Sequence, residues 1–259
     1  MFLFSRRVAL FAVSVLSLAD TTRADEIKVM TSGAFTAALL QLRGEFERTT
    51  HHQMVTVFGA SMGGAPDSIP SRLQRGETAD VVILAAPALD ELIQQNKVVR
   101  GSRVDLVRSS IGVAVRAGTS RPDISSAGAL RRALLAAKSI AYSASASGVY
   151  VSQELFQRLG IAEQMGSKCK RIDSEPVGAV VARGDADIGF QQISELLPVP
   201  GIDYLGPLPP ELQKATVFSA GVGAGAKNPD AARALIKFLA SPAAARAITD
   251  TGLELITSH

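Results

Sequence analysis

The sequence repeatedly places a short apolar strand before a loop of small polar residues and then a helix. The fullest example is Ser139–Gly160, which reads SIAYSASASGVYVSQELFQRLG. Its strand is Ile140–Tyr142, and the apolar residues beyond the loop recur at the 3.6-residue spacing of an amphipathic helix that Gly160 ends. Alternating strands and helices predict a doubly wound α/β architecture built on largely parallel sheets.

The N-terminal half follows this alternation closely. Strands are expected at 27–30, 53–58 and 79–84, and helices at 36–50, 67–75 and 87–95. The third of these strands, ADVVIL, is apolar after its second residue, which is typical of a strand buried on both faces of a parallel sheet.

The alternation restarts near residue 108, which indicates a second α/β half. There we expect strands at 111–115, 140–142, 169–172 and 187–190, with helices between them. Five prolines in 198–210 predict an irregular crossing segment, after which a strand at 216–220 and helices at 229–240 and 242–251 return to the first half. The prediction is two doubly wound lobes joined by a two-crossing hinge, with lobe 1 at 25–107 plus 215–259 and lobe 2 at 108–214.

Residues 1–24 have the order of a secretory signal peptide. Arg6 and Arg7 precede the apolar run Val8–Leu18, and Ala24 supplies a small residue for cleavage. The apolar run is too short to span a membrane comfortably. We therefore expect the mature protein to be exported to the periplasm.

Composition excludes several function classes. The net charge of the 259 residues is only +3, and no run of lysine and arginine predicts a nucleic-acid partner. Cys169 is the single cysteine, and His51, His52 and His259 lack the spacing of metal ligands. No P-loop or dinucleotide fingerprint occurs. We expect no cofactor, no metal and, because no exposed apolar stripe stands out, a monomer.

The polar loops should meet in one place. They lie at 31–36, 59–64, 143–148 and 173–178, two from each half, and each follows an expected strand. Ligands of open α/β sheets bind outside the carboxyl ends of the strands. Serine hydroxyls and the free N–H groups of helix starts can bind an anion there, so the loops predict a small-anion site in a cleft between the lobes.

The order of these motifs resembles the periplasmic molybdate-binding proteins, which are type II solute-binding proteins of ABC importers. The resemblance rests on Phe58–Ser61, Ala79–Ile83, Ser147–Tyr150 and Asp187–Gly189, and it covers nearly all of the mature chain. It implies a two-lobed periplasmic-binding-protein fold and an ABC permease as a partner. It also implies an oxyanion held by loop serines, backbone N–H groups and a tyrosine.

Carried over by position, the resemblance has matches and departures. Ser61, Ser147 and the backbone near Ser174 match, whereas Ala34 stands at a serine position and Gln192 at the tyrosine position. The candidate ligand-binding residues are Ser32, Gly33, Ala34, Ser61, Ser147, Gly148, Ser174 and Gln192. With two donors changed, a di- or tricarboxylate becomes an alternative to a molybdate-like oxyanion.

Two functions stay open from the sequence. The first is a receptor that captures a small anion for an ABC importer. The second is an enzyme on the same scaffold, because an exported aconitate isomerase is similar to this family; it transfers an allylic proton and so needs a base near that carbon. Glu175 and Asp173 are candidates for the base and Tyr150 for a proton relay, although Glu175 also fits as a carboxylate that favours a helix start.

Overall fold

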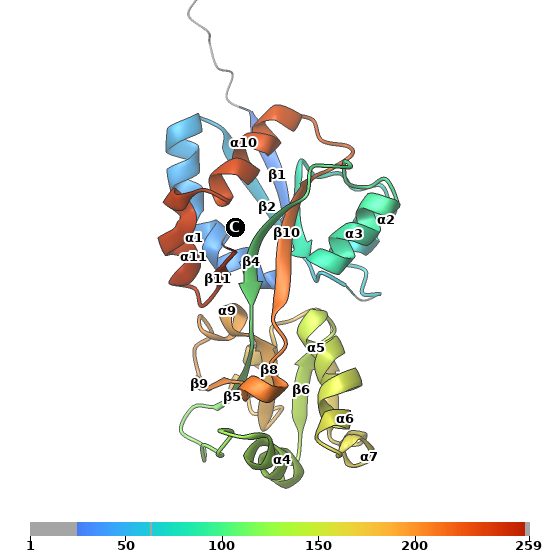
Figure 1. Cartoon of the computed structure of the whole chain (residues 1–259), viewed down its shortest axis with the longest axis vertical. Coiled ribbons are helices and arrows are strands. Elements are labelled where there is room, and N and C mark those ends of the chain that lie inside the picture. Colours follow the sequence, from blue (N-terminus) through green and yellow to red (C-terminus); the bar gives the residue numbers. More distant parts are fainter. Residues whose placement is uncertain (1–24, 63, 257–259) are drawn as a thin grey trace, which may run out of the picture.

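The computed structural model describes residues 25–62 and 64–256. The expected signal peptide 1–24, Gly63 and residues 257–259, with His259, lie outside the described residues. The described chain forms two α/β lobes stacked along the long axis of the molecule (Figure 1). The predicted fold class, two α/β lobes each built on its own sheet, is confirmed.

Lobe 1 is built on a six-stranded sheet with the order β11-β4-β10-β3-β1-β2. Its strands are β1 (Glu26–Thr31), β2 (Gln53–Phe58), β3 (Val81–Ala85), β4 (Val104–Ser109), β10 (Thr216–Val222) and β11 (Glu254–Leu255). Its helices are α1 (Gly33–Thr50), α2 (Ile69–Gln74), α3 (Ala86–Gln94), α10 (Pro229–Leu239) and α11 (Ala245–Thr249), with a 3₁₀ turn at Pro242–Ala244. β1 pairs in parallel with β2 and β3, whereas β10 is antiparallel to both of its neighbours.

Lobe 2 is built on a five-stranded sheet with the order β7-β6-β8-β5-β9. Its strands are β5 (Ile111–Arg116), β6 (Ile140–Ser143), β7 (Cys169–Ile172), β8 (Ile188–Gln192) and β9 (Ile202–Pro207). Its helices are α4 (Ala127–Ala136), α5 (Ala146–Tyr150), α6 (Phe156–Arg158), α7 (Ala162–Met165), α8 (Val177–Ala182) and α9 (Ile193–Leu196), with a π turn at Val151–Leu155 and a 3₁₀ turn at Pro210–Leu212. β6 is parallel to β7 and β8, and β5 is antiparallel to β8 and β9.

The structure corrects two expectations about strands. Both sheets are mixed rather than largely parallel, because β10 and β5 enter them in the opposite direction. The proline-rich segment is not irregular throughout, since it contains β9, which pairs only with β5 at the sheet edge. Proline is tolerated on an edge strand because it removes a donor that the ladder does not need.

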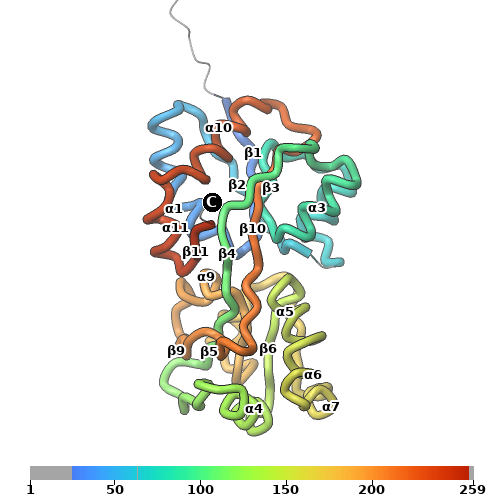
Figure 2. The backbone as a smooth tube through the Cα atoms, in the orientation of Figure 1, coloured from blue at the N-terminus to red at the C-terminus, as the bar shows by residue number. Residues whose placement is uncertain are grey.

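The two lobes are joined by two chain crossings. β4 ends at Ser109 and β5 begins at Ile111, so a single residue separates a strand of one sheet from a strand of the other. The second crossing runs from β9 to β10 and lies beside the first (Figure 2). A pair of extended crossings of this kind permits hinge closure around a ligand.

Helix α1 anchors the core of lobe 1. Phe35, Ala38, Leu39, Leu42 and Phe46 recur at helical spacing and are all buried against the sheet. Helix α1 begins at Gly33, with one residue between it and the end of β1, and its N-terminus faces the space between the lobes.

Candidate functional site

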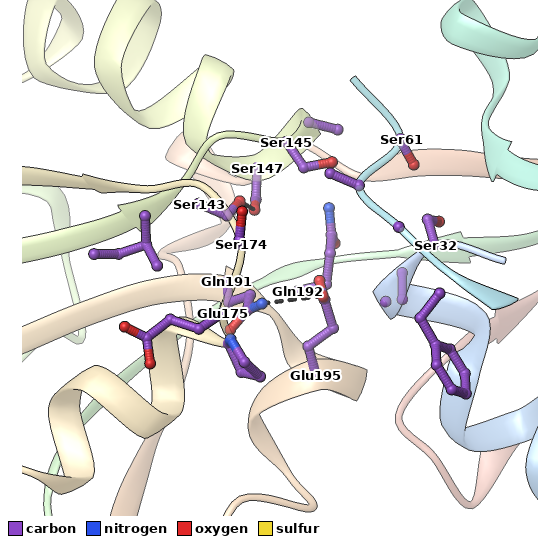
Figure 3. A pocket seen from close by; sticks show the side chains of 18 of the residues that line it. Ser32, Ser61, Ser143, Ser145, Ser147, Ser174, Glu175, Gln191, Gln192 and Glu195 are labelled. Carbon is purple, nitrogen blue, oxygen red and sulfur yellow. Dashed lines mark hydrogen bonds between the residues drawn. The ribbon is translucent and has the colours of Figure 1, made fainter. Parts of the chain in front are cut away.

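The loops that follow β1, β2, β6, β7 and β8 enclose a cleft of about 210 Å³ between the lobes (Figure 3). Lobe 1 lines it with Ser32, Gly33, Ala34, Phe58, Gly59, Ala60, Ser61, Asp67 and Phe218. Lobe 2 lines it with Ser143, Ser145, Ala146, Ser147, Ile172, Asp173, Ser174, Glu175, Pro176, Gln191, Gln192 and Glu195. None of these lining residues is lysine, arginine or histidine, so a bound anion meets hydroxyl, amide and backbone N–H donors.

The serines of the cleft are held by the strands and helix starts. Ser61 is fully buried, and its Oγ accepts a hydrogen bond of 3.0 Å from the Ala85 backbone N–H, which leaves the hydroxyl hydrogen for a second acceptor. Ser143 Oγ and Ser147 Oγ lie 3.1 Å apart. Ser32 is buried, and its Oγ has no hydrogen-bond partner among the described residues. A buried hydroxyl without a partner is costly unless a ligand satisfies it.

Glu195 projects from α9 into the middle of the cleft. Its Oε1 accepts a hydrogen bond of 3.0 Å from Gln191 Nε2, and Gln191 Oε1 in turn accepts one of 2.9 Å from the Val177 backbone N–H. The second bond fixes which way the Gln191 amide faces. Burial raises the pKa of Glu195 to about 7, against the smaller opposing effects of the Gln191 side chain and the Gln192 backbone N–H. Near neutral pH this carboxyl is therefore present in both protonation states.

The Glu195 carboxyl belongs to lobe 2 but lies against lobe 1. A Cβ on Gly33, the first residue of α1, would overlap Glu195 Oε1, so only glycine permits this approach. The neighbouring Ser194 Oγ donates a hydrogen bond of 2.8 Å to the Ala34 carbonyl and ties α9 to α1. The acid thus stands at the N-terminus of α1, where the two lobes meet.

The two carboxylates predicted from the sequence lie at the rim instead. Glu175 is exposed and forms two hydrogen bonds of 2.8 and 3.1 Å with Arg183, which lower its pKa. Asp173 pairs with Arg171 at 2.8 Å. Figure 3 shows the Glu175 carboxylate turned away from Glu195. The ion pair with Arg183 leaves Glu175 a poor base at neutral pH.

Tyr150 does not line the cleft. It is buried in the core of lobe 2, where its hydroxyl donates to the Leu212 carbonyl and accepts a hydrogen bond of 3.1 Å from Arg158. The placement speaks against a proton relay at this position, because the hydroxyl is already engaged and lies outside the cleft.

The predicted ligand-binding residues separate into two groups. Seven line the cleft: Ser32, Gly33, Ala34, Ser61, Ser147, Ser174 and Gln192. Gly148 does not, because it packs against the end of β6, where a Cβ would overlap the Ser143 carbonyl oxygen. The Gln192 amide nitrogen, oriented to satisfy its surroundings, donates to Ser109 Oγ at 2.8 Å and so ties β8 to the hinge crossing.

Sequence reasoning missed Glu195 and Phe58. Glu195 follows the helix N-cap Gln192 by three residues, a spacing at which a glutamate commonly reaches back to the cap. This spacing is the one sequence signal that singles out Glu195. Phe58 ends β2, is 50% exposed and lines the cleft, whereas the pattern of its strand predicts an apolar residue without a role in binding.

Comparison with known proteins gives a matching family and two similar proteins. Residues 27–254 match the family model described as bacterial extracellular solute-binding protein. The chain is 43% identical over 258 residues to an aconitate isomerase from a Pseudomonas species, covering 98% of each protein. It is 26% identical over 270 residues to the molybdate-binding protein ModA of Azotobacter vinelandii, covering 98% of this chain and 99% of that protein.

The solved structure of the periplasmic molybdate-binding protein from Azotobacter vinelandii shows the same fold. Its TM-score is 0.71 at 22% identity, covering 89% of this chain and 100% of that chain. Within residues 25–62 and 64–256, no helix combines the length and hydropathy that a membrane span requires.

Proposed function

Because this chain belongs to the bacterial extracellular solute-binding proteins, we propose that its cleft binds a small organic tricarboxylate and that the protein is an aconitate isomerase. The observation that carries the proposal is Glu195, a titratable acid at the centre of a cleft whose other lining groups near it are neutral. A general base works best when its pKa lies near the working pH. The 43% identity to an aconitate isomerase over nearly the whole chain supports the same reaction.

The chemistry needs one proton to move between two carbons. In aconitate a methylene carbon and a vinyl carbon flank a central carbon, and each of the three carries a carboxylate. Glu195 takes a proton from the methylene carbon, the released electron pair forms a double bond to the central carbon, and the electron pair of the old double bond moves to the vinyl carbon. That carbon then receives a proton from protonated Glu195. The product has the same connectivity, and its new double bond can take the other geometry.

The cleft also offers carbon surface, which an inorganic oxyanion does not use. Phe58 of lobe 1 and Ile172 and Pro176 of lobe 2 all line the cleft. Phe58 is half-exposed. Burial of this ring against a carbon skeleton is favourable, whereas molybdate has no apolar surface to cover the ring and would leave it exposed to water.

A second candidate function is a receptor that delivers an organic anion to an ABC permease. The neutral serine and backbone donors of the cleft favour it, because a receptor needs only to bind and release its ligand. Under either function we place the mature protein in the periplasm after removal of residues 1–24.

The two functions separate in one experiment on the mature protein. Thermal unfolding is measured with molybdate, sulfate, citrate, cis-aconitate and trans-aconitate, since a ligand that binds the folded state raises Tm. Each aconitate isomer is then followed by ultraviolet absorbance for conversion. Conversion supports the isomerase, stabilisation by a tricarboxylate without conversion supports the receptor, and stabilisation by molybdate alone contradicts both an isomerase and a tricarboxylate receptor.

The substitution Phe58→Ala should weaken aconitate binding by roughly 1–2 kcal/mol, because the ligand loses the ring that covers its carbon skeleton. Isothermal titration calorimetry measures the change. Val55→Ala is the matched control, since Val55 lies on the same strand, is also exposed and does not line the cleft. An unchanged affinity in the Phe58 variant would place the ligand elsewhere.

Ser61→Ala and Ser147→Ala should each weaken aconitate binding by roughly 1–3 kcal/mol, the cost of leaving a buried anion contact unmade. The same titration measures both variants. Ser241→Ala serves as the control, because its hydroxyl bonds the Phe238 carbonyl far from the cleft. If neither cleft serine matters, the carboxylates bind to other donors.

A further inference from the structure

The Glu195 carboxyl lies beside the N-terminus of α1 in the cleft. Helix α1 has 18 residues and begins at the cleft, so its free N–H groups and the positive end of its dipole face that space. Its N-cap residue, Ser32, makes no side-chain cap bond, and its buried Oγ has no partner among the described residues. Glu195 Oε1 lies against Gly33 at this helix start.

The remaining groups of the cleft would suit an inorganic dianion. Serine hydroxyls and backbone N–H groups are neutral donors, the kind that can surround an oxyanion without a counter-charge. The other carboxylates that face the cleft, Asp67, Asp173 and Glu175, lie at its rim and bond Ser174, Arg171 and Arg183 respectively. Glu195 is therefore the one carboxyl among the described lining residues that meets a ligand at the centre.

We propose that Glu195 determines the ligand specificity of the cleft: its carboxyl group fills the anion position at the N-terminus of α1 and excludes inorganic oxyanions such as molybdate and sulfate. This inference rests on the proposed function, in which the same carboxyl faces the carbon skeleton of an organic acid. A tetrahedral oxyanion presents charged oxygen in every direction and must place one against Glu195. A tricarboxylate can turn a C–H bond toward Glu195 and its charges toward the serines.

The test is a gain of binding in Glu195→Gln, which keeps the shape of the side chain and the hydrogen bond from Gln191 but removes the charge. Titration calorimetry with sodium molybdate and sodium sulfate measures the affinity. At pH 9, where Glu195 is ionised because its pKa is about 7, we expect wild type to bind neither anion in the millimolar range and the variant to gain affinity on the order of 100-fold, the scale of one close charge repulsion in a partly buried site. Glu175→Gln removes a rim charge from the same cleft and should gain nothing.

Three results would overturn the proposal. The first is that wild type binds molybdate as tightly as Glu195→Gln does. The second is that the folded Glu195→Gln variant binds neither anion. The third is that Glu175→Gln gains as much affinity as Glu195→Gln. Should Glu195→Gln fail to fold, Glu195→Ser gives the same test with a smaller neutral side chain. The proposed function fails by a different observation, the absence of aconitate turnover in wild type, so the two failures are distinguishable.

Discussion

Replacing Glu195 by glutamine should lower the rate of aconitate isomerisation by about 10²–10⁴-fold, the usual contribution of a general base. Glutamine accepts the hydrogen bond from Gln191 and fills the same space, but it cannot take a proton from carbon. The loss should therefore appear in kcat, with the affinity for aconitate retained or increased. Ultraviolet absorbance gives the initial rates in both directions, and calorimetry gives the affinity.

Glu163→Gln is the control for this result, because Glu163 lies on α7, is exposed and does not line the cleft. Its rate should equal that of wild type. A Glu195→Gln variant that keeps more than about a tenth of the wild-type rate, a loss smaller than general-base removal gives, would show that another group removes the proton.

The same substitution should stabilise the folded protein in a pH-dependent way. Burial raises the pKa of Glu195 from 4.5 to about 7 in the folded state, so folding favours the protonated carboxyl. That favourable contribution is complete below pH 4.5 and is lost as the pH rises through about 7. Glutamine is neutral at every pH and loses nothing. At pH 8 the variant should exceed wild type in free energy of unfolding by about 2 kcal/mol, a figure reduced because the Glu195 residue as a whole is only half-buried.

This difference should be read from urea unfolding at several pH values between 5 and 8. For a chain of this size, about 2 kcal/mol corresponds to a rise in Tm of roughly 4–8 °C. The gap between variant and wild type should close toward pH 5, whereas Glu163→Gln should follow wild type throughout. If the free energy of unfolding depends on pH in the same way for wild type and Glu195→Gln, then folding does not raise the pKa of Glu195.

The fold could be predicted because local signals and tertiary structure agree over most of the chain. The apolar run before residue 85 became β3, and the five apolar residues of α1 recur at the spacing that a helix on a sheet requires. β4 and β9 escaped prediction for local reasons. Charged Asp105 and Arg108 interrupt the pattern of β4, and prolines flank β9 at the sheet edge.

The site was only partly predictable, because loops can be placed from the sequence whereas partners cannot. The serine loops follow strands, so their convergence follows from the architecture alone. The role of Glu195 depends on α9 lying against α1, a contact between residues about 160 positions apart, as in the bond from Ser194 to Ala34. Glu175 is a reasonable candidate for the base by residue type, but its ion pair with Arg183 cannot be read from the sequence.

The central claim, that the cleft is a catalytic site for aconitate, is tested most directly by proton NMR of trans-aconitate incubated with the purified mature protein. The vinyl and methylene signals of the two isomers are distinct, so formation of either isomer is visible without a coupled assay. We predict that cis-aconitate signals grow to equilibrium with wild type and stay at the level of the protein-free sample with Glu195→Gln. Saturable binding of trans-aconitate by wild type without any cis-aconitate would contradict the account and leave a receptor in its place.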